Sequence, residues 1–291
     1  MHKAHPDETP FKAAMRAQWN SAAPGWNAHT AIIREWLRQP TDAMCRMAGV
    51  MTGSRVLDVA AGAGEQTLII ARLAGPQGHV LATDLSPAIL ALARENVDAA
   101  GFERVETRVA DGEDLGVAAS SFDAAVCRLG LMFFPDPLRG LRQMHQALRP
   151  GGGACTMVFS RPESNPCLTI LMSTALRHAG LPAGDPALPG GLLSLGQPGH
   201  IDRLFRAAGF HDVATTAIDA VFRMPSVDDY LAFVRSSASP ILDILRRLAP
   251  VAAEAAWSEM RDRLDVYTTS DGWAGPNELL LTAGRRPPET T

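Results

Sequence analysis

Residues 55–64 read Arg-Val-Leu-Asp-Val-Ala-Ala-Gly-Ala-Gly, and this stretch decides the fold. An apolar run meets a carboxylate, Asp58, and is followed by three alanines and two glycines before a helix-like segment begins at Glu65. A strand that ends in a turn of small residues lets a ligand approach the backbone closely. The stretch therefore predicts a nucleotide-like ligand, and the surrounding residues must show which one.

The chain around this stretch alternates between strands and helices. Clean helix starts at Ser86-Pro87 and Asp136-Pro137 separate the strand candidates. Alternation of this kind implies parallel strands with helices on both faces of the sheet. The strand candidates are 55–60, 79–83, 105–110, 122–127 and 154–160, and the helix candidates between them are 64–74, 86–100 and 136–148.

The two flanks of this region have different patterns. We expect N-terminal helices at 10–20, 26–38 and 41–48, with Pro24-Gly25 separating the first two. After residue 160 a long segment rich in Pro and Gly, 181–199, interrupts the pattern. Loops of this length are usually functional or mobile. Helices are expected at 166–180, 199–208, 226–248 and 250–264, and strands at 211–223 and 278–283.

The composition excludes several classes of protein. The 291 residues are 46% hydrophobic and carry a net charge of −4, which favours a soluble protein and argues against a nucleic-acid partner. The polar stretch 1–10 does not resemble a signal peptide, and no 18-residue apolar run predicts a membrane span. We therefore expect a cytoplasmic protein, and a homodimer is compatible with these features. The four scattered cysteines are expected to be buried and reduced; a thiophilic metal site or a redox pair is the alternative.

Two nucleotide ligands fit a strand, a glycine turn and a helix: a nicotinamide dinucleotide and S-adenosylmethionine. A dinucleotide site needs a third small residue near the pyrophosphate, where this chain has the β-branched Thr67. Asp58 is also a poor neighbour for a pyrophosphate but suits a ligand with an ammonium group. Asp84, after the second strand, could accept the ribose hydroxyls of either ligand. Asp111 and Gly112 end the third strand, where a carboxylate could meet the exocyclic amine of adenine.

Five ordered motifs together resemble one family. They read Val-Leu-Asp-Val-Ala-Ala-Gly-Ala-Gly at 56–64, Ala-Thr-Asp-Leu-Ser at 82–86, Ala-Asp-Gly-Glu at 110–113, Ser-Phe-Asp-Ala-Ala-Val-Cys-Arg at 121–128 and Leu-Arg-Pro-Gly-Gly at 148–152. In this order they are similar to the class I S-adenosylmethionine-dependent methyltransferases, especially the ubiquinone/menaquinone-biosynthesis-like branch. The resemblance covers about 55–160. It implies a Rossmann-like α/β fold with a seven-stranded, mostly parallel sheet and helices on both faces.

The resemblance also implies a division of the chain and a reaction. Residues 1–50 would form a helical lid, 51–160 the S-adenosylmethionine-binding core, and 161–291 helical acceptor-pocket insertions plus the last two strands of the same sheet. The reaction would be methyl transfer by in-line displacement to the oxygen, nitrogen or carbon of a small, largely apolar organic acceptor. Catalysis would come mainly from positioning. An NAD-dependent oxidoreductase and a cofactor-binding module without turnover are the alternatives.

The resemblance assigns roles to residues of the cofactor site. Asp58 would bind the amino group of the methionine part, directly or through water, and Asp84 the ribose. Asp58 and Asp84 could instead cap the following helices, and Arg128 could be an ordinary ion-pair partner. Ala60 stands where the commoner loop has glycine. The remaining cofactor residues are Gly62, Gly64 and Gln66 at the methionine end, Leu85, Asp111 and Gly112 around adenine, and Arg128 and Leu129 between cofactor and acceptor.

The sequence gives fewer indications of the residues that would bind the acceptor. His29, in the expected lid, is the candidate base, with a packing or surface role as the alternative. Trp26, Phe133 and Phe134 are the candidate acceptor contacts, although such residues could simply join the lid to the core. No metal ligands are expected.

Overall fold

The main sheet of the computed structural model has seven strands in the order β3-β2-β1-β4-β5-β10-β6. The structure describes residues 9–183, 190–237 and 239–289. Strands β1 to β5 are parallel to one another, whereas β10 is antiparallel to both β5 and β6. This confirms the Rossmann-like, mostly parallel sheet. The strands are β1 (Arg55–Val59), β2 (His79–Asp84), β3 (Val105–Val109), β4 (Phe122–Arg128), β5 (Leu148–Phe159), β6 (His211–Asp219) and β10 (Glu278–Arg285).

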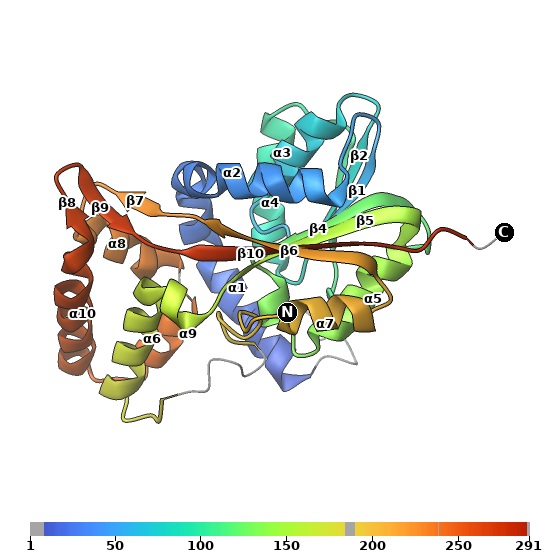
Figure 1. Cartoon of the computed structure of the whole chain (residues 1–291). Coiled ribbons are helices and arrows are strands. Elements are labelled where there is room, and N and C mark those ends of the chain that lie inside the picture. The colour runs from blue at the N-terminus through green and yellow to red at the C-terminus, as the bar shows by residue number, and fades with distance from the viewer. Residues whose placement is uncertain (1–8, 184–189, 238, 290–291) are drawn as a thin grey trace.

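Helices cover both faces of this sheet (Figure 1). Helices α2 and α3 lie on one face, and α5 and α7 lie on the other. The Ser86 and Asp136 side chains cap α4 and α5 by accepting backbone N–H bonds, with Pro at the first helical position of each, as the sequence predicted. The helices are α2 (Thr30–Ala48), α3 (Glu65–Ala74), α4 (Pro87–Ala99), α5 (Pro137–Ala147) and α7 (His200–Ala207).

The N-terminal region differs from the sequence prediction. Helix α1 (Pro10–Ala28) runs through Pro24, and the break between α1 and α2 falls at His29. The predicted break at Pro24-Gly25 and the separate helix at 41–48 were therefore wrong. A Cβ on Gly25 would collide with the backbone carbonyl of Ser236. This glycine lets α1 approach α8 (Val227–Ser237) closely and does not end a helix.

The C-terminal region adds a helical group and a second, small sheet that the sequence did not predict. The expected strand 211–223 divides, because β7 leaves the main sheet and pairs with β9. Helix α6 packs against α10 and α9, and Figure 1 shows this group around one end of β10. Residues 184–189 of the Pro/Gly-rich segment lie outside the described residues. The elements are α6 (Pro166–His178), β7 (Phe222–Met224), α8 (Val227–Ser237), α9 (Ser239–Leu245), α10 (Pro250–Leu264), β8 (Thr268–Thr269) and β9 (Gly272–Gly275), with short 3₁₀ turns η1 (Leu131–Phe133), η2 (Pro162–Ser164) and η3 (Asp265–Tyr267).

The four cysteines are free and buried, as expected. Burial raises the pKa of the Cys127 thiol to about 12, so it stays protonated at neutral pH. In the part of the chain that the structure describes, no helix is both long and apolar enough to cross a membrane. The same residues contain no group of His, Cys, Asp or Glu side chains arranged as metal ligands.

Candidate functional site

A cavity of about 190 Å³ lies at the carboxyl ends of β1, β2 and β4, beneath α1. The strand order reverses between β1 and β4, and this is where open α/β sheets bind their ligands. Three predicted site residues, Asp58, Gly64 and His29, do not line the cavity. The predicted residues that do line it are Trp26, Ala60, Gly62, Gln66, Asp84, Leu85, Asp111, Gly112, Arg128, Leu129, Phe133 and Phe134.

The loop after β1 brings backbone to the cavity wall. Ala60 has φ 55°, in the left-handed region that costs a non-glycine residue roughly 1–2 kcal/mol. Its methyl group occupies the space that a side chain at position 130 would need, and residue 130 is glycine. The departure from the commoner loop at Ala60 is therefore accommodated by Gly130. Gly64, at the N-terminus of α3, packs against Ala93 behind the wall.

Asp58 lies behind this loop, fully enclosed in the protein. Its two carboxylate oxygens accept hydrogen bonds from the Gln66 side-chain amide and, at 2.6 Å, from the Thr67 hydroxyl. Burial raises the pKa of Asp58 to about 6, and the hydrogen bonds from Thr67 and Gln66 oppose that rise. Of these three residues only Gln66 lines the cavity. The Asp58 carboxylate therefore fixes the direction of the Gln66 side chain.

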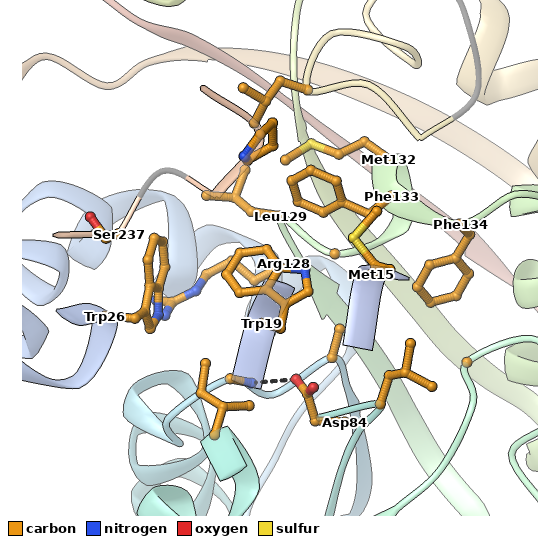
Figure 2. A pocket seen from close by; sticks show the side chains of 18 of the residues that line it. Met15, Trp19, Trp26, Asp84, Arg128, Leu129, Met132, Phe133, Phe134 and Ser237 are labelled. Atoms are coloured by element: carbon orange, nitrogen blue, oxygen red, sulfur yellow. Dashed lines mark hydrogen bonds between the residues drawn. The ribbon is translucent and has the colours of Figure 1, made fainter. Parts of the chain in front are cut away.

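Asp84 stands at the end of β2 and faces the cavity (Figure 2). One carboxylate oxygen accepts from the Gly62 backbone N–H at 3.0 Å and the other from the Ser86 N–H at 2.9 Å. Burial raises the pKa of Asp84 to about 6, against the opposing effect of these backbone bonds. The carboxylate thus links the β1 and β2 loops and keeps further acceptor capacity for a ligand.

Two acidic residues after β3, Asp111 and Glu113, form ion pairs with α1, the helix that covers the cavity. The Lys12 ammonium of α1 lies 2.6 Å from an oxygen of Asp111 and 2.6 Å from an oxygen of Glu113. Burial lowers the pKa of Lys12, but the two carboxylates outweigh it and raise the value above that of free lysine. Gly112, between the two acids, lies directly under the Phe134 ring. The two ion pairs of Lys12 therefore hold α1 against the loop after β3, which the sequence analysis expected beside adenine.

Arg128 ends β4 in a buried ion pair. Its guanidinium is 2.6 Å from a Glu65 oxygen and donates to the Thr41 hydroxyl at 3.0 Å. Arg34 approaches the other Glu65 oxygen at 3.3 Å. Both Arg128 and Glu65 are less than a tenth exposed, so each charge depends on its partner. The ion-pair alternative for Arg128 is thus observed, while the residue also lines the cavity.

Aromatic side chains form the rest of the cavity. Trp19 lies edge-on to Trp26 at 6.0 Å and to Phe133 at 5.5 Å between ring centroids. In Figure 2 these rings and Asp84 face the same space. Deeper, Trp36 packs against Phe222 at 4.7 Å, and its indole N–H donates to the Ala220 carbonyl. Other aromatic and aliphatic lining comes from Phe159, Leu168, Leu171, Leu192, Tyr230, Phe233 and Ile241.

His29 lies outside this lining. Its Nδ1 is 2.7 Å from the Gly25 carbonyl oxygen, and its ring meets Phe233 edge-on at 5.1 Å. Its backbone separates α1 from α2. The geometry therefore supports the packing alternative for His29 and provides no support for a base at this position.

Residues 31–174 match the model of the ubiE/COQ5 methyltransferase family. The chain is 34% identical over 139 residues to the ubiquinone/menaquinone biosynthesis C-methyltransferase UbiE of Hahella chejuensis. That match covers 47% of this chain and 54% of the relative, so the chain spans about half the length of the curated relatives it matches. Residues 31–174 are thus a class I methyltransferase domain of the ubiE/COQ5 type. The resemblance inferred from the five motifs is confirmed.

Solved structures share the fold of this methyltransferase domain. The phosphoethanolamine N-methyltransferase 2 of Haemonchus contortus, in complex with phosphomonomethylethanolamine and S-adenosylhomocysteine, superposes with a TM-score of 0.59 at 17% identity, over 97% of this chain and 61% of that one. The YcgJ protein of Bacillus subtilis gives a TM-score of 0.58 at 17% identity, over 87% of this chain and 100% of that one. At these identities the likeness shows the fold alone.

The cofactor of this class of methyltransferase is S-adenosylmethionine, and the cavity fits it. A half-buried carboxylate, Asp84, faces the space at the end of β2, and a second acidic position, Asp111, follows β3. The dinucleotide alternative is not favoured by the family match. Thr67, where a dinucleotide loop needs a small residue, donates its hydroxyl to Asp58.

Sequence reasoning missed several residues that line the cavity of the methyltransferase domain. Glu113 follows Asp111-Gly112 directly and could have been found from that motif. Lys12 and Tyr230 carry no local signal, because each lies on a helix far along the chain from the motifs.

Proposed function

We propose that this chain transfers the methyl group of S-adenosylmethionine to the oxygen, nitrogen or carbon of a small, largely apolar organic acceptor. The observation that carries the proposal is one continuous cavity with two kinds of wall. The strand ends β1 to β4 supply the carboxylates and backbone of the family motifs, and α1, α6 and α8 supply aromatic and aliphatic side chains. A cofactor at the first wall and an acceptor at the second would meet inside the protein.

The nucleoside part of the cofactor is assigned to the ends of β2 and β3. Asp84 would accept hydrogen bonds from the ribose hydroxyls while it keeps its two backbone bonds. Leu85 would pack on adenine, with Asp111 and Gly112 at its edge. Because Asp111 already accepts from Lys12, we expect the adenine amine to share that carboxylate with the lysine.

The methionine part is assigned to the loop after β1. The backbone of Ala60 and Gly62 and the side-chain amide of Gln66 would hold it, with Arg128 and Leu129 beside it. Asp58 was expected at the amino group. Because it is enclosed behind the wall, we propose instead that it acts on the cofactor through Gln66.

The chemistry needs little from the protein beyond position. S-adenosylmethionine, when bound, supplies a sulfonium-activated methyl group suited to in-line displacement. Trp19, Trp26 and Phe133 exclude water around the point where the two walls meet. Holding two reactants in place gives effective molarities on the order of 10⁵–10⁸ M. Among the described residues that line the cavity there is no histidine, which supports catalysis mainly by positioning.

The proposal also covers the location of the protein, its binding partners and the role of its N-terminal helices. We propose a cytoplasmic enzyme without a nucleic-acid partner, since the net charge is −4. Residues 1–50 would act as a lid, because α1 covers the cavity and Lys12 fastens it. Light scattering tests whether the protein forms a homodimer. Cell fractionation tests its location in the cell.

Calorimetric titration tests the cofactor. S-adenosylmethionine and S-adenosylhomocysteine should bind, and NAD should not. Tight binding of NAD without a response to the other two would overturn the proposal.

A methyl-transfer screen tests the reaction. Labelled S-adenosylmethionine is incubated with the protein and cell extract, and the labelled product is identified by mass spectrometry. An apolar small molecule should acquire the label. Cofactor binding without transfer to any component would favour the non-catalytic binding module instead.

A further inference from the structure

Tyr230 carries a hydroxyl that the cofactor assignment does not use. The residue lies on α8, lines the aromatic part of the cavity and is 5% exposed. Its ring packs among other lining residues, including Phe222 at 5.7 Å between centroids. Within the described residues its hydroxyl makes no hydrogen bond. The other ionisable lining residues, by contrast, all hold partners: Lys12, Asp84, Asp111, Glu113 and Arg128.

The ring of Tyr230 is held in place from behind. It stacks on Trp273 of β9 with centroids 4.1 Å apart and planes 19° apart. Trp273 is 1% exposed and its indole N–H donates to the Leu264 carbonyl at 2.8 Å. The small sheet that the sequence did not predict therefore supports this tyrosine.

Among the described residues, the Tyr230 hydroxyl is not one of the fully enclosed side-chain atoms that lack a partner, so it opens onto the cavity. A ligand oxygen or nitrogen that accepts from it would gain a hydrogen bond worth about 0.5–1.5 kcal/mol, which phenylalanine at this position could not supply. Burial also raises the pKa of Tyr230, so the hydroxyl stays neutral and can donate. Asn277 lines the same cavity, and one of its two side-chain amide N–H groups donates to the Gly275 carbonyl at 3.3 Å. The tyrosine hydroxyl is a donor at this end that no described protein group uses.

We propose that Tyr230 determines acceptor specificity by donating a hydrogen bond to one polar oxygen or nitrogen of a flat, otherwise apolar acceptor. The walls around it, Phe222, Phe233 and Leu171, suit an aromatic ring system. The phenol binds and orients the acceptor and takes no proton from it. This inference rests on the proposed function, because it assumes that the acceptor occupies the aromatic end of the cavity.

Two probes of nearly equal shape test the hydrogen bond. Binding of 2-naphthol and 2-methylnaphthalene is measured by calorimetry with the protein saturated with S-adenosylhomocysteine. The unmodified protein should bind 2-naphthol about five- to tenfold more tightly. Tyr230→Phe should lose this preference and bind 2-methylnaphthalene as before.

The only other tyrosine of the chain provides a matched control. Tyr267 meets Trp273 edge-on at 6.3 Å and does not line the cavity, so Tyr267→Phe should keep the preference. The inference is overturned if the unmodified protein does not prefer 2-naphthol, if it binds neither probe, or if Tyr230→Phe keeps the preference. S-adenosylhomocysteine binding is measured first and independently, so a failure of the cofactor proposal is seen separately.

Discussion

The two ends of the cavity are built in different ways. The proposed cofactor end comes from residues 58–130, where the polar groups lie near strand ends and have partners, as Asp84 does with the Gly62 and Ser86 N–H groups. The aromatic end comes from segments far apart in the sequence, including α1, β5, α6, β7 and α8. Short-range sequence order therefore specifies the cofactor site, whereas the acceptor site depends on how distant elements pack.

Removal of the Asp84 carboxylate should weaken cofactor binding more than any other change. Asp84→Ala removes the proposed ribose acceptor and the link between the β1 and β2 loops. Hydrogen bonds to charged groups contribute roughly 1.5–3 kcal/mol each, so we expect the Kd for S-adenosylhomocysteine to rise about 100-fold. Calorimetry checks this. Asp123→Ala is the control, because Asp123 pairs with Arg149 away from the cavity; equal effects of the two changes would mean that the site is misplaced.

Acidification should also weaken cofactor binding, by a smaller factor. The pKa of Asp84 is about 6, so the carboxylate is charged at pH 7 and mostly protonated at pH 5. The Kd for S-adenosylhomocysteine should rise about tenfold over this interval, since one acceptor oxygen becomes a donor.

The effect of pH on the free energy of unfolding distinguishes weaker cofactor binding at low pH from unfolding of the protein. The native pKa of Asp84 exceeds its ordinary value of 3.8, so the native state binds more protons than the unfolded state between these values. Its contribution to the free energy of unfolding therefore increases as the pH falls through 6. Asp58, with a similar pKa, does not line the cavity. Asp84→Asn should flatten the pH profile, and a profile that keeps its slope would exclude Asp84 as the titrating group.

The contrast between the two ends also explains what the sequence could predict. The seven strands and the proposed cofactor residues follow from alternation and from the order of the motifs, because strand ends in a parallel sheet meet at one edge. The role of Asp58 was harder to predict, since burial behind the loop depends on the Thr67 and Gln66 side chains. Tyr230 reads as an ordinary apolar position of a helix, and only the packing of β9 against it shows otherwise.

Lys12 joins the two ends, and its removal should have a moderate effect. Lys12→Met breaks both contacts of α1 with Asp111 and Glu113 while it keeps the length of the side chain. We expect faster hydrogen exchange of α1 amides, measured by mass spectrometry, and a Kd for S-adenosylhomocysteine about threefold higher, typical of a partly exposed ion pair. Arg38→Met is the control, because its contact with Glu35 is exposed and lies at 3.9 Å. Unchanged exchange of α1 would show that the lysine does not fasten the lid.

The smallest effect is expected at His29, at the junction of α1 and α2. The ring packs on Phe233 and its Nδ1 is near the Gly25 carbonyl, so His29→Ala removes packing at a helix junction but no group that lines the cavity. Transfer to the acceptor found in the labelled screen should stay within about twofold, and the thermal midpoint should fall by a few degrees. A base would behave differently: its removal typically lowers the rate by about 10²–10⁴-fold and changes the pH–rate profile. A loss of that size in a folded His29→Ala protein would require His29 to reach the acceptor, and would place the chemistry beside the junction of α1 and α2 instead of between the strand ends and the aromatic end of the cavity.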